Sequence, residues 1–268
     1  MAKKTIKNRN TSSSKGREQA IPTQTIARAV DILKLINMGP QDITGIAQQL
    51  GISKSTAYRL LFSLEKTGMA MRDRENRRFQ FGPLIAKFSA NYLVMHENLC
   101  ICADNEMNSL RNISRETIAL FIQIGVNGMY LNEHISPEPL RYSPGIGELS
   151  PLYAGAGEKV ILSEVPFNKL QLILDNLELK PMGPNTIVDK DAMMQEVADI
   201  KERGYATAFE EKSVGGASIA VPIKNYTQPV ALCIIGPSMR LAPKMMGLLN
   251  ELMQSANKIS DKLLKLTY

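Results

Sequence analysis

Residues 42–69 read Asp-Ile-Thr-Gly-Ile-Ala-Gln-Gln-Leu-Gly-Ile-Ser-Lys-Ser-Thr-Ala-Tyr-Arg-Leu-Leu-Phe-Ser-Leu-Glu-Lys-Thr-Gly-Met. In the first part of this stretch the apolar residues recur at the period of an amphipathic helix: Ile43, Ile46, Ala47 and Leu50. Asp42 or Thr44 can cap the beginning of that helix through a side-chain oxygen. Gly51 can adopt the left-handed conformation that ends it. The stretch therefore predicts a short helix followed by a tight turn.

A second helix is expected directly after the turn, with Ser53 as its N-cap. Its predicted buried face consists of Ala57, Leu60, Leu61 and Leu64. The opposite face is polar and basic near its beginning, where it carries Lys54, Ser55, Tyr58 and Arg59. This pattern indicates a helix-turn-helix, whose second helix enters the DNA major groove and brings its first turns to bases and phosphates. An ordinary helical hairpin with a solvated face is the alternative interpretation.

The residues after this helix pair predict a basic β-hairpin. Thr67-Gly68 ends the second helix, and Asp73 to Asn76 is typical turn sequence between two short strand-like arms. Four arginines lie on the hairpin: Arg72, Arg74, Arg77 and Arg78. Such a hairpin is typical of the wing of a winged helix-turn-helix, which lies on the phosphate backbone or in the minor groove. Helix, turn, helix and basic hairpin in this order argue against the helical-hairpin alternative.

The positive charge of the chain is concentrated in this N-terminal third. Residues 1–82 contain 15 lysines and arginines against 6 acidic residues, whereas residues 83–268 contain 17 against 20. The net charge of +6 therefore belongs to the segment with the DNA motif. This distribution indicates a basic DNA-binding domain on a nearly neutral body.

Several other kinds of site lack support in the sequence. The cysteines, Cys100, Cys102 and Cys233, do not have zinc-ligand spacing and are expected to be small buried residues in a reducing cytosol. The two histidines, His96 and His134, have no accompanying metal motif, so neither a metal nor a cofactor is expected. No apolar run approaches the roughly 20 residues that span a bilayer. The expected location is the cytoplasm.

The sequence predicts a disordered basic tail over residues 1–21 and a winged helix-turn-helix over residues 22–82. A linker helix is expected over residues 83–97 and a second domain over residues 98–268. A helix over about 25–36 should complete the three-helix core of the DNA-binding domain. Its predicted buried side consists of Ile26, Ala29, Val30, Leu33 and Ile36.

The second domain is predicted to be α+β. After a helix at about 98–114, short strands are expected at 117–124, 129–135, 140–142, 205–209, 217–224 and 229–235. Helices are expected after the glycine-rich turn at 155–157 and at about 167–177, 190–203 and 241–266. Helices segregated around a mainly antiparallel sheet leave a sheet face that can line a pocket.

The chain resembles the IclR family of bacterial transcription regulators over about residues 24–266. The motifs that carry the resemblance are Thr25-Ile-Ala-Arg28-Ala-Val-Asp-Ile-Leu, Ile46-Ala-Gln-Gln-Leu-Gly-Ile-Ser-Lys-Ser-Thr-Ala-Tyr-Arg-Leu-Leu, Pro139-Leu-Arg, Ser150-Pro-Leu-Tyr-Ala-Gly-Ala-Gly-Glu-Lys, Arg203-Gly-Tyr and Ala220-Val-Pro-Ile. The resemblance implies a GAF-like α/β effector-binding domain at the C-terminus. It also implies dimerisation through the DNA-binding domain and tetramers through the bodies.

The resemblance further implies an effector pocket in the body. Its residues would be Tyr142, Ser150, Gly155, Ala156, Gly157, Ala208, Ser218, Cys233 and Ile235. Backbone N–H groups at Gly155–Gly157 would attract an anion at a helix N-terminus. A tight turn that packs a helix on a sheet is the structural alternative. The chain departs from the family pattern at Glu158, Ala208, Ser218, Cys233 and Ile235. The departure at Glu158 places a negative charge near the expected anion site.

The expected function is a sequence-specific repressor of a catabolic operon whose DNA affinity is controlled by a small metabolite, an organic acid by family resemblance. A dimer would bind an inverted-repeat operator in double-stranded DNA. The residues expected at DNA are Arg28, Thr44, Ser53, Lys54, Ser55, Thr56, Tyr58, Arg59, Arg72, Arg74, Arg77 and Arg78. A constitutive DNA-binding regulator without an effector is the alternative. An enzyme is disfavoured because no catalytic triad, phosphate loop or metal cluster stands out.

Overall fold

The computed structural model describes residues 23–266, apart from the side chain of Leu93. The tail predicted at residues 1–21 lies outside the described residues. The chain divides into two compact units, with the boundary between Val94 and Met95.

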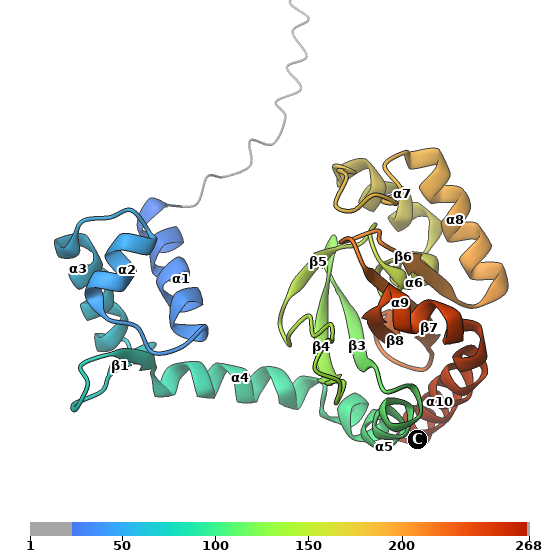
Figure 1. Ribbon diagram of the computed structural model, residues 1–268, viewed down its shortest axis with the longest axis horizontal. Helices are drawn as coiled ribbons and strands as arrows, with labels where there is room; N and C mark the ends of the chain where they lie inside the picture. The colour runs from blue at the N-terminus through green and yellow to red at the C-terminus, as the bar shows by residue number, and fades with distance from the viewer. Residues whose placement is uncertain (1–22, 267–268) are drawn as a thin grey trace, which may run out of the picture. The chain divides into compact units, whose positions relative to one another are not determined.

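The first unit is a winged helix-turn-helix (Figure 1). Its elements are α1 (Gln24–Asn37), α2 (Ile43–Gln49), α3 (Lys54–Lys66), β1 (Ala70–Arg72) and β2 (Phe79–Phe81). The next helix, α4 (Pro83–Met95), contains the boundary between the units near its end. β1 and β2 pair antiparallel, and Gln41 extends this ladder by exchanging two backbone hydrogen bonds with Phe79.

Side-chain caps and a glycine turn fix the helix-turn-helix. Asp42 is the N-cap of α2, because its Oδ1 accepts a hydrogen bond from Gly45 N at 2.8 Å. Ser53 caps α3 in the same way, by accepting from Thr56 N at 3.1 Å. Gly51 lies between the helices at φ +61°, where a Cβ is disfavoured. Asp42, and not Thr44, is therefore the cap of α2.

The buried side of α1 differs from the prediction. Ile32 and Ile36 are buried against α2 and α3, whereas Ile26 is 62% exposed and Val30 is also exposed. Ala29, Leu33 and Ile36 pack into the core as predicted, so the prediction is wrong only at Ile26 and Val30, and it missed Ile32. Because α1 is apolar on more than one side, its sequence alone does not select the side that packs.

The second unit is an α+β domain (Figure 1). Its elements, in chain order, are α5 (Glu97–Ser114), β3 (Thr117–Ile124), β4 (Asn127–His134), β5 (Leu149–Pro151), α6 (Ala156–Glu164), α7 (Phe167–Asn176), α8 (Lys190–Arg203), β6 (Ala206–Phe209), β7 (Gly216–Ile223), β8 (Val230–Pro237), α9 (Ser238–Leu241), the 3-10 turn η1 (Ala242–Lys244) and α10 (Met245–Leu266).

The strands form one six-stranded sheet in the order β5-β4-β3-β8-β7-β6, and every neighbouring pair is antiparallel. α6 packs on β3, β6, β7 and β8 and against α8. α10 and α5 pack on each other, and they contact β7 and β3 respectively. The sheet therefore lies between two groups of helices (Figure 1).

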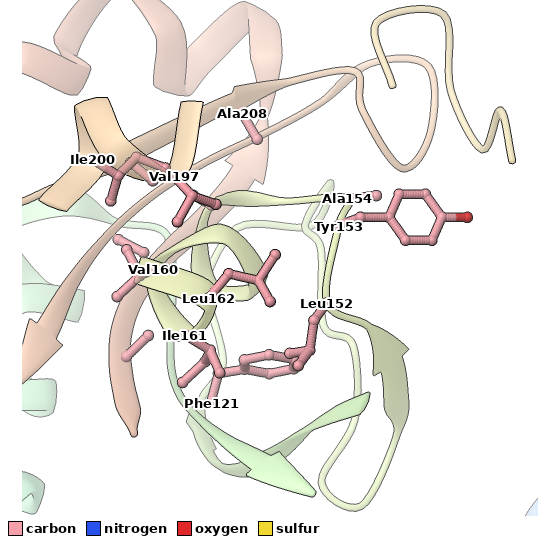
Figure 2. Close-up of a cluster of buried hydrophobic side chains, with 14 of the residues drawn as sticks. Phe121, Leu152, Tyr153, Ala154, Val160, Ile161, Leu162, Val197, Ile200 and Ala208 are labelled. Atoms are coloured by element: carbon pink, nitrogen blue, oxygen red, sulfur yellow. The ribbon is translucent and has the colours of Figure 1, made fainter. Parts of the chain in front are cut away.

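The core on the α6 side holds α6 against the sheet. Val160, Ile161 and Leu162 of α6 are fully buried, among Phe121 of β3 and Val197 of α8 (Figure 2). Gly157 lets α6 approach β8 closely, because a Cβ there would lie 2.6 Å from Cys233 Sγ. This packing fixes the N-terminal end of α6 over the sheet.

One expectation for the body is wrong. Residues 140–142 form no strand, and β5 pairs with β4 instead. The carbonyls of Leu140 and Tyr142 accept hydrogen bonds from side chains, those of Arg240 and Thr117, rather than from a neighbouring strand. The C-terminal helix predicted at 241–266 is confirmed as α10, which begins at Met245. The 3-10 turn η1 precedes it and contains Pro243, whose missing N–H is tolerated only in the first turn of a helix.

Candidate functional site

The exposed surface of α3 brings together the residues predicted at its leading end. Lys54, Ser55, Tyr58 and Arg59 are all exposed, while Ala57 on the opposite side is fully buried. Tyr58 stacks on the ring of Phe62, with the ring centroids 6.3 Å apart. Ser53 and Thr56 lie at the same end, but the Ser53 hydroxyl is already engaged as the helix cap.

The wing presents three exposed arginines: Arg74, Arg77 and Arg78. Asp73 holds its turn together, because Asp73 Oδ1 accepts from the backbone N–H groups of Glu75 and Asn76. Arg72 braces the hairpin: its Nε donates to Arg77 O at 3.2 Å, and its guanidinium lies 5.5 Å from the centre of the Phe79 ring.

The cations of α3 and the wing have no carboxylate partners among the described residues. None of the ion pairs between described residues includes Lys54, Arg59 or a wing arginine. Thr44 on α2 is exposed and Arg28 on α1 is half-buried. A helix end and a hairpin with unpaired cations form a surface that suits a polyanion.

The second unit contains a cavity of about 110 Å³ at the N-terminal end of α6. It is lined by Tyr130, Tyr142, Pro144, Gly155, Gly157, Glu158, Ala208, Glu210, Glu211, Lys212, Ser213, Gly216, Ala217, Ser218, Cys233 and Ile235. Seven of the nine residues expected at an effector pocket are in this lining. Ser150 and Ala156 are not. Ser150 Oγ is buried without a hydrogen-bond partner among the described residues.

Side chains of the same unit already bind the backbone N–H groups at the start of α6. Gly155, at φ +114°, donates its N–H to Glu211 Oε2 at 3.0 Å. Ala156 N donates to Ser218 Oγ at 3.2 Å. Ala156 therefore takes part in the turn without lining the cavity.

Lys159 neutralises Glu211 from behind the cavity wall. Its ammonium is 2% exposed and lies 2.6 Å from Glu211 Oε1 and 3.3 Å from Glu196 Oε1. It also donates to Thr207 O at 2.9 Å. Burial raises the pKa of Glu211, an effect that Lys159 opposes.

A second ion pair lies in the cavity itself. Lys212 Nζ binds Glu158 Oε1, donates to Tyr130 Oη at 3.2 Å and lies 5.2 Å from the centre of the Tyr130 ring. Tyr130 Oη in turn donates to Glu158 Oε1 at 3.4 Å. Burial raises the pKa of Tyr130 well above its usual value, and Glu158 adds to the shift.

Sequence reasoning missed the charged residues of the loop between β6 and β7. Glu210, Glu211 and Lys212 form a charged run that is normally a solvated turn, yet all three line the cavity. Tyr142 fixes the far end of this loop: its Oη lies 2.9 Å from Ser213 Oγ and donates to Val214 O at 3.2 Å. The following Gly215-Gly216 pair was the one signal of an unusual loop.

Other kinds of site are not supported within residues 23–266. No group of three or more potential metal-ligating side chains is found there. None of the described helices is both long and apolar enough to cross a bilayer.

Comparisons with known proteins match both units. The family model for the IclR helix-turn-helix domain matches residues 25–74, and that for the C-terminal domain of bacterial transcriptional regulator IclR matches residues 91–261. The HTH-type transcriptional regulator BhcR of Paracoccus denitrificans is 26% identical over 249 residues, which cover 91% of this chain and 89% of BhcR.

Solved structures agree with this assignment. IclR of Thermotoga maritima is similar at a TM-score of 0.73 and 28% identity, over 89% of this chain and 98% of that one. An IclR homolog from Microbacterium hydrocarbonoxydans, complexed with 4-hydroxybenzoate, shares the fold at a TM-score of 0.71 and 20% identity, over 90% of this chain and 100% of that one. Both domains match in the family's order, so the chain belongs to the IclR family of transcriptional regulators, which are not enzymes.

Proposed function

We propose that this regulator represses a catabolic operon by binding an inverted-repeat operator as a dimer, and that a small metabolite bound in the body controls its DNA affinity. The observation that carries the proposal is the pairing of two features in one chain. One is the cationic surface of α3 and the wing, and the other is the cavity at the start of α6.

The DNA part of the proposal assigns roles by position. The leading end of α3, with Lys54, Ser55 and Arg59, reads base edges and phosphates in the major groove. Arg74, Arg77 and Arg78 on the wing bind phosphates, which fixes the register without specifying sequence. Two copies related by a twofold axis place their α3 helices about one helical turn of DNA apart.

The effector part rests on the cavity and on the relative that holds 4-hydroxybenzoate. A metabolite that binds the free and the DNA-bound regulator with different affinity shifts the regulator's affinity for DNA by the ratio of those two affinities. An organic acid is the ligand class expected by resemblance. The lining of this cavity argues against an acid, because Glu158, Glu210 and Glu211 contribute carboxyl groups to it.

Competition binding tests the proposal. The full-length protein is titrated with its own promoter fragment and with a scrambled duplex of equal length, at physiological ionic strength, with and without a metabolite panel. We expect a preference of at least 10³-fold for the promoter, the lower end for specific regulators. A metabolite at about 100 times its dissociation constant should stabilise the fold by about 2.7 kcal/mol. Equal binding to both duplexes under all conditions would refute the proposal.

A constitutive regulator is the second candidate. It is favoured by one observation, the occupation of the cavity by the chain's own Lys212 ammonium. In that case promoter selectivity is retained and no metabolite changes the promoter affinity or the thermal stability. The same titrations therefore separate the two candidates.

A further inference from the structure

The charges that face the cavity are predominantly negative. Glu158, Glu210 and Glu211 contribute three carboxyl groups, and Lys212 contributes one ammonium group. Glu158 is 2% exposed and Glu211 is also buried, so water screens neither of them well. Lys159 compensates Glu211 from the side of Glu196 and Thr207 and is not part of the lining. With Lys212 paired to Glu158 and Lys159 to Glu211, the carboxylate of Glu210 leaves the lining with one negative charge in excess.

The anion-binding capacity of the α6 N-terminus is partly used by the chain itself. Its positive helix end favours negative charge, and this chain supplies two carboxylates there. Glu211 accepts the Gly155 N–H, Ser218 accepts the Ala156 N–H, and Glu158 lies so close that a Cβ on Gly155 would be 2.3 Å from Glu158 Oε2. An incoming carboxylate would meet two like charges and only part of the helix end's N–H groups. The site is therefore unfavourable for an anionic ligand.

The surroundings of the Lys212 ammonium show which kind of ligand group fits this cavity. Its ammonium has a carboxylate on one side, a phenol oxygen at 3.2 Å and the face of an aromatic ring at 5.2 Å. A carboxylate together with an aromatic face is a favourable environment for an ammonium group. Lys212 reaches it from the loop between β6 and β7 and is 31% exposed, so its side chain has a route to solvent. Lys159, at 2% exposed, has none.

Part of the remaining lining is apolar. Ala208, Ala217, Cys233 and Ile235 contribute apolar side chains, and Tyr142 adds an aromatic ring. Burial raises the pKa of Cys233 well above its usual value, so this residue stays a neutral thiol. A cavity of about 110 Å³ suits a small body beside a charged head.

We propose that the effector cavity takes a small organic cation, a primary ammonium on an aliphatic or aromatic body, whose charged head replaces the Lys212 ammonium at Glu158 and Tyr130. This inference rests on the proposed effector role of the cavity and changes the expected ligand class from acid to amine. Lys212 acts as a tethered competitor that the ligand displaces.

Calorimetric titration of the full-length protein tests the ligand class with three compounds that share one ring. The compounds are 4-hydroxybenzylamine, 4-hydroxybenzoate and 4-hydroxybenzyl alcohol, which carry positive, negative and no charge on the side group. We expect the amine to bind at least 10-fold more tightly than either of the others. Equal or tighter binding of the benzoate overturns the inference.

Two variants and a control locate the binding. Glu158→Gln should weaken amine binding by at least 10-fold, and Lys212→Met should tighten it several-fold because the competitor is gone. Lys190→Met removes an exposed lysine, 3.7 Å from Asp175, and should leave binding unchanged. Amine binding that is unaffected in Glu158→Gln, or absent in both the wild type and Lys212→Met, overturns the inference. If Glu158→Gln does not fold, the ranking of the three compounds and Lys212→Met decide.

The same preparations separate this inference from the proposed function. A protein that prefers its promoter and responds to 4-hydroxybenzoate, but not to the amine, remains a ligand-controlled regulator with an acidic effector, and only the ligand class is overturned. A protein that binds the amine as expected but shows no promoter preference retains the cation site and refutes the proposed regulator.

Discussion

The two units handle charge in opposite ways. In the first unit the cations of α3 and the wing are exposed and have no carboxylate partners among the described residues. In the second unit the central charges are buried in pairs, as in Lys159 with Glu211 and Glu116 with Arg240. The first arrangement leaves charge for an external polyanion. The second neutralises charge internally, so that a charged ligand must compete with the chain's own groups.

Breaking the buried pair of the second unit should have the largest effect. Lys159→Met leaves Glu211 buried without its cation, and loss of one partner of a buried pair costs about 3–5 kcal/mol. Chemical denaturation, with hydrogen exchange followed over residues 95–266, measures the loss. The double variant Lys159→Met/Glu211→Gln should lose less than the single one, and the exposed Lys190→Met should be neutral. A loss below about 1 kcal/mol, as is usual for exposed pairs, would contradict the comparison.

Removing an unpaired cation of the first unit should affect binding and not stability. Arg59→Ala is expected to weaken operator binding by about 1–3 kcal/mol if Arg59 reads a base edge. Lys66→Ala, at the other end of α3, is the matched control and should have a smaller effect. Titrations with operator and scrambled duplex measure both. Unchanged affinity and selectivity in Arg59→Ala would remove Arg59 from the interface.

The cap of α3 offers a smaller test within the first unit. Ser53→Ala removes the acceptor for Thr56 N and should lower the free energy of unfolding by about 1 kcal/mol. Ser63→Ala is the control, because the Ser63 hydroxyl only donates to Arg59 O within the helix. Hydrogen exchange over residues 43–66 reports the difference. Equal exchange in the two variants would show that the cap is dispensable.

Protonation of histidines at mildly acidic pH should lower the stability of the second unit alone. This is the smallest of the expected effects. The chain has two histidines, His96 and His134, and both lie in that unit. Burial lowers the pKa of each below 6.5, an effect that Asp104 opposes at His134. The unfolded chain therefore binds protons more readily, and the free energy of unfolding should fall as the pH drops below about 6.5.

Denaturation at pH 7.5 and pH 5.5 checks this pH dependence. His96→Gln/His134→Gln should show a smaller decrease than the wild type over this interval. Exchange over residues 24–82 should be equally pH-dependent in both proteins, after correction for intrinsic rates. The same decrease in both proteins would assign the effect to carboxyl groups instead.

The sequence predicted elements that depend on local signals. The period of Ile43, Ile46 and Ala47 and the cap at Ser53 were sufficient for α2, the turn and α3. The side on which α1 packs was not predictable, because Ile26 and Ile32 are equally apolar and only the partner helices distinguish them. Residue patterns suggest surfaces, but tertiary packing selects among them.

The residues that line the cavity also fall into two groups, those that were predicted and those that were missed. The resemblance supplied Gly155, Gly157, Tyr142, Ala208 and Cys233, and the two glycines by themselves indicated only a tight turn. Glu210, Glu211 and Lys212 were missed because an acidic and basic run is normally exposed. Only closure of the loop between β6 and β7 over the α6 N-terminus brings these charges inside.

Under the proposed displacement of Lys212 by a ligand, the contact of Lys212 with Glu158 has a consequence for the set point of the regulator. A site that its own side chain fills most of the time binds an outside molecule with an apparent dissociation constant raised by the reciprocal of the vacant fraction. The threshold concentration is then encoded by the strength of one contact in one surface loop. Mutations there can retune sensitivity over orders of magnitude, while the residues that select the promoter remain unchanged.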